Sequence, residues 1–195
     1  MPTEQEHAAL VLGPEDEGKF VSAADFAQAE FVAPWKYERE EGRLVVMPPD
    51  GYEHQTTAEP WRNVLGAYAL LHPEIVRHVF SAPWVRDEDE YDFIGDIGVY
   101  LVTIDPAPPI PERAPDIMFE IVSPGRVSRE RDYVKKRERY HAIGIREYVI
   151  VNRFAKTVLV LTRRDDRYAE RLLTEDDVYS SPLLPGFELA LHDLF

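Results

Sequence analysis

The chain contains no cysteine. This absence excludes a disulfide framework, thiolate zinc sites and a cysteine nucleophile, so any metal must bind to oxygen or imidazole ligands. No stretch approaches eighteen consecutive apolar residues, and the start "MPTEQEHAALVLGPEDEGKF" lacks the basic and apolar segments of a signal peptide. We therefore expect a soluble, cytoplasmic protein that does not enter a membrane.

Several catalytic motifs are absent as well: GxxxxGK[ST], GxGxxG, HExxH and GxSxG. Nucleotide hydrolysis, dinucleotide redox chemistry, zincin proteolysis and esterase chemistry therefore have no motif support. Basic residues are scarce: the chain has 22 Lys and Arg residues but 36 Asp and Glu residues, which gives a net charge of −14. Such a charge repels polyanions at long range and argues against a simple nucleic-acid coat protein.

What is present fits one globular domain, with 195 residues of which 45% are hydrophobic. Residues 1–21 are acidic and aperiodic, which predicts a flexible arm, followed by a single domain over 22–195. Ser22 is a suitable N-cap for a short helix over residues 22–31, and residues 36–50 predict a hairpin turning at Glu41-Gly42. Apolar spacing predicts a helix from Pro60 to His72, with Pro60 in its first turn.

The second half of the chain alternates strands and helices. Residues 74–87 and 91–103 indicate strands, and 106–115 a proline-rich connection. A buried strand follows within 115–125, then a helix over 128–143 ended by Gly144 and a strand over 146–152. Residues 156–174 predict a hairpin turning at Asp165-Asp166. The tail "LLPGFELALHDLF" is expected to close the domain. This order predicts an α/β (α+β) fold, a mixed central sheet flanked by helices.

Glu120 interrupts the apolar run "PDIMFEIVSPG" at residues 115–125. A carboxylate in a buried strand costs several kcal/mol or more unless a cation or hydrogen bonds compensate it. A second acid, Asp96, begins a strand that we expect to pair with this one. Two carboxylates on neighbouring strands can share a divalent cation. The alternative is that each caps backbone amides at the end of its strand.

A basic helix follows the Glu120 strand. Residues 126–139 hold seven basic and three acidic side chains, a net of +4, so the rest of the chain carries −18. The helical period places Lys136 on one face with Tyr133, Arg137 and Tyr140, whereas Lys135 points nearly opposite. We therefore expect Lys136 to reach the carboxylate site, although a lysine that extends past two tyrosines to solvent is an alternative.

Four blocks of this sequence, read together, resemble a known family. They are "YEREEGRLVVMPPDGYEHQ", "GDIGVYLV", "APDIMFEIVSPGRVSRERDYVKKRERYHAIGIREYVIVN" and "LLPGFELALHDLF". Over residues 22–195 the chain resembles the Uma-two family of restriction-endonuclease-like proteins, in the PD-(D/E)XK nuclease superfamily. The resemblance implies a restriction-endonuclease-like core with an extra N-terminal hairpin and a C-terminal β-hairpin. It also implies a Mg²⁺-dependent endonuclease, with Mn²⁺ as a substitute, acting on nucleic acid and foremost on DNA as a homodimer.

The resemblance also suggests roles for individual residues. Asp96 corresponds to the first strand acid and Glu120 to the acid of the second motif. Val122 stands where the superfamily usually has its lysine, but in this family the lysine comes from the following helix, where Lys136 matches. Glu38 corresponds to a glutamate of the early hairpin and His54 to a histidine at a helix start, both as additional catalytic candidates.

In the site that the resemblance implies, Asp96, Glu120 and the carbonyl of Ile121 hold Mg²⁺, while Lys136 orients or helps to deprotonate the attacking water. The phosphate-binding candidates are Arg126, Arg129 and Arg131. The family's usual proline before the first acid is replaced by Gly95.

Two other functions remain open. The first is a catalytically inactive module that keeps the nuclease fold and binds nucleic acid or protein. The second is a sugar hydrolase that uses Asp96 and Glu120 as acid and base. Lys136 argues against the second, because a neighbouring cation lowers the pKa that a general acid needs. The sequence does not distinguish DNA from RNA, or single from double strands.

Overall fold

The computed structural model describes residues 10–87, 90–102 and 113–195. The chain divides into two compact units, Met1–Pro49 with Arg86–Phe93, and Asp50–Val85 with Ile94–Phe195. Of the predicted arm, residues 1–9 lie outside the described residues, whereas residues 10–21 contain β1 (Val11–Leu12) and the 3-10 helix η1 (Pro14–Asp16). The division into an arm and one domain over 22–195 stays a prediction.

The first unit is built around a hairpin. As predicted, β3 (Lys36–Glu40) and β4 (Arg43–Met47) meet at Glu41-Gly42, where both residues have a positive φ, 51° and 73°, as a tight two-residue hairpin turn requires. The four-stranded sheet has the order β4-β3-β7-β6, with β6 at Trp84–Asp87 and β7 at Tyr91–Ile94.

The predicted first helix is also present. It is α1 (Ala23–Gln28), and the Ser22 hydroxyl accepts a hydrogen bond from the backbone N–H of Asp25, which confirms the cap. After this helix, β2 (Glu30–Phe31) pairs in parallel with β1.

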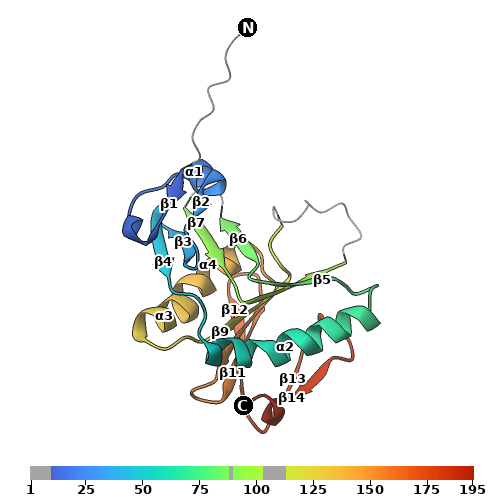
Figure 1. Cartoon of the computed structure of the whole chain (residues 1–195). Helices are drawn as coiled ribbons and strands as arrows, with labels where there is room; N and C mark the ends of the chain where they lie inside the picture. The colour runs from blue at the N-terminus through green and yellow to red at the C-terminus, as the bar shows by residue number, and fades with distance from the viewer. Residues whose placement is uncertain (1–9, 88–89, 103–112) are drawn as a thin grey trace. The chain divides into compact units, whose positions relative to one another are not determined.

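The second unit contains a six-stranded mixed sheet in the order β12-β11-β10-β9-β8-β5 (Figure 1). The strands are β5 (Val76–Ser81), β8 (Ile97–Leu101), β9 (Ile117–Ile121), β10 (Glu147–Asn152), β11 (Thr157–Arg163) and β12 (Tyr168–Thr174). Strands β9 and β10 are parallel, and the other neighbours in this order are antiparallel. The predicted mixed sheet is therefore confirmed.

The long helix α2 (Tyr52–Leu71) begins earlier than the sequence predicts. The predicted start at Pro60 is wrong, since Pro60 lies inside the helix and Gly51 caps it. The apolar spacing begins only at Trp61, because the sequence of the first two turns, "YEHQTTAE", is largely polar and has no apolar stripe, although His54 and Ala58 are buried. Trp61 packs against Phe119 of β9 at 5.4 Å between ring centroids, which places α2 on one face of the sheet.

The connection from β9 to β10 covers the opposite face. It is one continuous helical stretch made of α3 (Arg126–Glu130), the π-helical turn η2 (Arg131–Lys135) and α4 (Lys136–Ala142). The stretch starts two residues before the predicted Ser128. Gly144, with φ of 93°, follows its end as predicted. The parallel pairing of β9 and β10 requires such a crossover.

The C-terminal segment completes the core, as predicted. The hairpin of β11 and β12 forms as expected, and β13 (Val178–Ser180), β14 (Glu188–Ala190) and the 3-10 helix η3 (Leu191–Asp193) follow it. Phe187 meets Tyr68 of α2 at 5.3 Å between ring centroids, so the tail packs on the α2 face (Figure 1). The predicted proline-rich connection lies largely outside the described residues, at 103–112.

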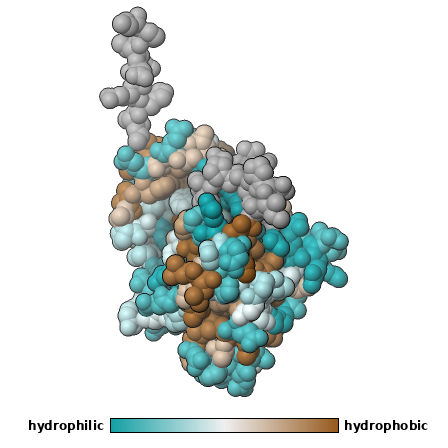
Figure 2. Space-filling view, turned by 90° about the vertical axis from the view of Figure 1, so that its right-hand side faces the viewer, coloured by the Kyte–Doolittle hydropathy of each residue, from teal (hydrophilic) through white to brown (hydrophobic). Residues whose placement is uncertain are grey.

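Among the described residues, no helix combines the length and the hydropathy needed to cross a membrane. On the face shown in Figure 2, hydrophobic patches in brown are bounded by hydrophilic residues in teal. The exposed apolar side chains include Leu70 and Leu71 at the end of α2.

Candidate active site

The pairing of β8 with β9 brings Asp96 opposite Glu120. Ile97 is aligned with Phe119, and the backbone N–H of Asp96 donates to the carbonyl of Phe119 at 3.2 Å. In an antiparallel pair the preceding and following residues are then also cross-strand neighbours. The predicted pairing of the two acid-bearing strands is therefore confirmed.

Glu120 faces away from the α2 side of the sheet. Phe119 and Ile121 belong to the apolar core on that side, and the alternation of β9 directs Glu120 to the face that the crossover helix covers. There the Lys136 ammonium donates to Oε1 of Glu120 at 3.0 Å, and the Tyr140 hydroxyl donates to the same oxygen at 2.9 Å. The ammonium also donates to the carbonyl of Ile94 at 2.9 Å. The predicted inward direction of Lys136 is confirmed.

Both acids have shifted pKa values, in opposite directions. Burial raises the pKa of Glu120 to about 8; the Lys136 ammonium opposes this effect and the charge of Asp96 adds to it. Burial also acts to raise the pKa of Asp96, but the hydrogen bond and charge of His54, with the Ile121 N–H, hold it below its ordinary value. Perturbed acids of this kind gather at functional sites more often than elsewhere.

His54 connects the start of α2 to this pair of acids. Its Nε2 lies 3.2 Å from Oδ2 of Asp96 and 3.1 Å from the carbonyl oxygen of Ile121. Its Nδ1 lies 3.7 Å from Oδ1 of Asp50, four residues earlier. The ligand atoms of Asp50, His54 and Asp96 all lie within 4.8 Å of one another. The structure thus brings His54, Asp96, Glu120 and Ile121 together.

The arrangement fits a divalent cation. Within the described part of the chain, the side-chain hydrogen bonds to Glu120 fall on Oε1 and the contacts of Asp96 fall on Oδ2. The second oxygen of each carboxyl group is therefore available to a cation. Carboxylate and carbonyl oxygens are the donors that Mg²⁺ and Mn²⁺ accept, and imidazole nitrogen suits transition metals.

The π-helical turn fixes the position of Lys136. The backbone N–H of Lys136 donates to the carbonyl of Arg131, five residues earlier, instead of to that of Asp132. The Tyr148 hydroxyl of β10 donates to the carbonyl of Asp132 at 2.9 Å. A strand side chain therefore satisfies the acceptor that a regular α-helix would pair with Lys136, and it ties the helix to the sheet.

Gly95, in place of the family's usual proline, has a local explanation. The side chain of Met118 occupies the space that a β-carbon at position 95 would need. The N–H of Gly95 also donates to the carbonyl of Pro83 at 3.0 Å, a bond that proline cannot make. Glycine at position 95 therefore fits both the packing of Met118 and the hydrogen bond to Pro83.

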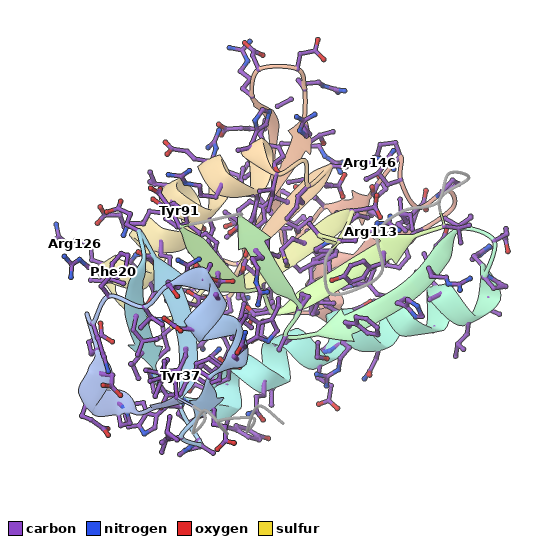
Figure 3. The ribbon with its side chains drawn as sticks, turned by 90° about the horizontal axis from the view of Figure 1, so that it is seen from above. Phe20, Tyr37, Tyr91, Arg113, Arg126 and Arg146 are labelled. Carbon is purple, nitrogen blue, oxygen red and sulfur yellow. The ribbon has the colours of Figure 1, made fainter. Side chains whose placement is uncertain are left out.

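Four other residues were predicted for the site: three arginines of the crossover helix and Glu38. Arg126 and Arg129 are exposed on α3, and Arg126 extends away from the ribbon (Figure 3). Arg131 is partly buried, with Nε 3.8 Å from Oδ1 of Asp132. Glu38 is buried on β3 of the first unit, not in the unit that carries the other acids. The roles of all four stay predictions.

Sequence reasoning missed two neighbours of the site. Asp50 stands four residues before His54, a helical spacing that would have been informative had α2 been extended to Tyr52. Tyr140 was predicted to lie on the Lys136 face but was given no role. Its spacing of four residues from Lys136 indicates that the two side chains are neighbours on the helix and can reach the same partner.

A family model for Uma2, described as "Putative restriction endonuclease", matches residues 23–192. The chain belongs to the Uma2 family. A solved structure from Anabaena variabilis ATCC 29413, titled a putative nuclease of DUF820, is 16% identical with a TM-score of 0.71; the match covers 90% of this chain and 97% of that one. It confirms the predicted fold. A comparison with curated proteins finds no match.

Proposed function

We propose that this Uma2 protein is a metal-dependent endonuclease that hydrolyses phosphodiester bonds of nucleic acid, with DNA as the first substrate to test. One observation carries the proposal. A buried lysine contacts a buried glutamate at 3.0 Å, one strand away from a second acid. The family match supports a nuclease-like hydrolase, and this constellation supplies the groups that such chemistry needs.

Asp96, Glu120 and the carbonyl of Ile121 are the residues that would hold the divalent cation, with Mg²⁺ and Mn²⁺ as the two to test. When bound, such a cation lowers the pKa of a coordinated water and offsets charge on the phosphate. The short hydrogen bond from the Ile121 N–H to Oδ2 of Asp96, at 2.6 Å, fixes that carboxylate. These contacts orient the carboxylate before any ligand arrives.

Lys136 acts on the reacting oxygens in this proposal. Two acceptors, Glu120 and the carbonyl of Ile94, hold its ammonium in place. An ammonium in a buried site orients the attacking water or stabilises charge that develops on the phosphate. Tyr140 shares the Glu120 oxygen with Lys136 and so positions the carboxyl group rather than the substrate.

The charge pattern supports weak, local binding of nucleic acid. The net charge of −14 repels a polyanion, while exposed Arg126 and Arg129 offer contacts to flanking phosphates beside the site. A homodimer, as the resemblance implies, would bring two such basic segments to one substrate. Light scattering of the purified protein tests that part of the proposal.

The proposed activity is tested by incubating the protein with supercoiled plasmid, linear duplex and single-stranded DNA, and with RNA, in Mg²⁺ or Mn²⁺. Asp96→Asn, Glu120→Gln and Lys136→Ala are compared with wild type, with chelator as the blank. Lys135→Ala is the matched control, because this neighbouring lysine is exposed. We expect metal-dependent cleavage that the three site variants lose and the control retains.

Cleavage that survives in the site variants would come from a contaminant or from another site, and the assignment would be wrong. Metal binding at Glu120 without turnover on any substrate would instead favour the non-catalytic binding module.

A further inference from the structure

The imidazole of His54 lies beside two of the groups proposed to hold the cation. Its Nε2 is 3.2 Å from Oδ2 of Asp96 and 3.1 Å from the carbonyl oxygen of Ile121. Adjacent ligands of an octahedral cation with bonds of about 2.1 Å lie about 3.0 Å apart. Both distances from Nε2 therefore lie in the range expected between neighbouring ligands of one cation.

Asp50 supplies a second, independent observation. Its Oδ1 lies 3.7 Å from Nδ1, on the opposite side of the ring, so its charge stabilises a proton on Nδ1 when Nε2 is bound to a cation. A histidine that binds a metal typically has a carboxylate or carbonyl next to its other ring nitrogen. Without a cation, Nε2 lies within hydrogen-bond distance of two acceptors, Asp96 and the Ile121 carbonyl, and a bound cation would take the place of the proton between them.

We infer that His54 is a nitrogen ligand of the proposed cation site, and that the site therefore binds Mn²⁺ more tightly than Mg²⁺. This inference rests on the proposed function. Mg²⁺ keeps several waters and binds few protein ligands, all of them oxygen, whereas imidazole favours transition metals. His54 is 9% exposed, so a cation held there exchanges bulk water for protein ligands, which disfavours Mg²⁺ further.

The experiment measures metal binding directly, without an activity assay. Mn²⁺ is titrated into the full-length protein and free Mn²⁺ is followed by electron paramagnetic resonance, with Mg²⁺ as competitor. Spin-echo modulation of the bound Mn²⁺ then reports whether a nitrogen nucleus is coordinated. The variants are His54→Asn, His54→Gln and Asp50→Asn. The control is His78→Asn, at an exposed position of β5.

We expect nitrogen modulation in wild type and in the control, and its loss in both His54 variants. Mn²⁺ affinity should fall by at least about tenfold in those variants while Mg²⁺ affinity is nearly unchanged. Asp50→Asn should retain the modulation but weaken Mn²⁺ binding by about tenfold. Circular dichroism confirms that each variant is folded.

Mn²⁺ bound to wild type without nitrogen modulation would overturn the inference, whatever the variants do. So would an unchanged Mn²⁺ to Mg²⁺ ratio in folded His54→Asn. A different result would contradict the proposed function itself. If Asp96→Asn and Glu120→Gln leave the binding of Mn²⁺ and Mg²⁺ unchanged, these two acids do not hold the cation.

Discussion

Two glutamates are buried in neighbouring strands of the same sheet, on opposite faces. Glu120 of β9 contacts the Lys136 ammonium and the Tyr140 hydroxyl. Glu147 of β10 accepts hydrogen bonds from the hydroxyls of Tyr179, at 2.7 Å, and Ser181, at 3.0 Å. Burial is the largest influence on both carboxyl groups and raises the pKa of each.

The difference lies in the partners. Glu147 has two neutral hydroxyl donors from the C-terminal tail, which satisfy it as part of the packing of that tail. Glu120 has a cation, a second acid on the adjacent strand and, beyond that acid, a histidine. A buried carboxyl group alone therefore does not indicate a site. A buried carboxyl group with ionisable neighbours of both signs does indicate a candidate functional site, because such groups can exchange protons and hold a metal.

The largest expected effect is a difference in DNA cleavage between variants of the two glutamates. Glu120→Gln should reduce metal-dependent DNA cleavage by about 100-fold or more, because it removes a proposed metal ligand and the partner of Lys136. Glu147→Gln should leave the rate close to that of wild type. Initial rates of plasmid nicking measure both. Equal losses in two folded variants would mean that the comparison does not reflect function.

Tyr140→Phe should have a smaller effect on the same reaction. Glu120 keeps Lys136 but loses one of the two donors that orient it, so kcat should fall by about tenfold with little change in KM. Single-turnover kinetics at saturating metal give the value. Tyr133→Phe, on the same helical stretch, is the control, and a rise in KM with kcat unchanged would contradict the positioning role.

Tyr179→Phe tests the other face. It leaves the buried Glu147 with one hydroxyl donor, so the free energy of unfolding should fall by about 1–2 kcal/mol while cleavage is unaffected. Urea denaturation monitored by fluorescence measures the change. If activity falls while stability does not, Glu147 has a role beyond packing.

The smallest effect is a change in how stability depends on pH. The pKa of Glu147 is higher in the folded chain than its ordinary value, so the folded state retains a proton that the unfolded state has lost. The stability contributed by this group is present below the ordinary glutamate pKa and is lost as pH rises through the folded value. Glu147→Gln should flatten that decline in urea melts between pH 4 and pH 8. A parallel decline in wild type and variant would assign it to other groups.

The sequence predicted the central part of the site because its signals are local. The apolar run around Glu120 and the face of Lys136 follow from strand and helix periods, and both directions are confirmed. The start of α2 was predicted wrongly, because its polar first turns carry no periodic signal. The π-helical turn was not predicted either, since it depends on a hydrogen bond from Tyr148, which is distant in sequence. Asp50 was missed as a consequence of the error in α2.

The π-helical turn η2 (Arg131–Lys135) also constrains how this chain can vary in length. Each residue of an α-helix rotates the next by about 100°, so removing one residue from the turn would carry every later side chain around the axis. Lys136 would then no longer face Glu120, nor would Tyr140. Insertions and deletions are tolerated in most surface connections, but in this crossover a single one would separate the lysine from its acid while leaving the helix intact.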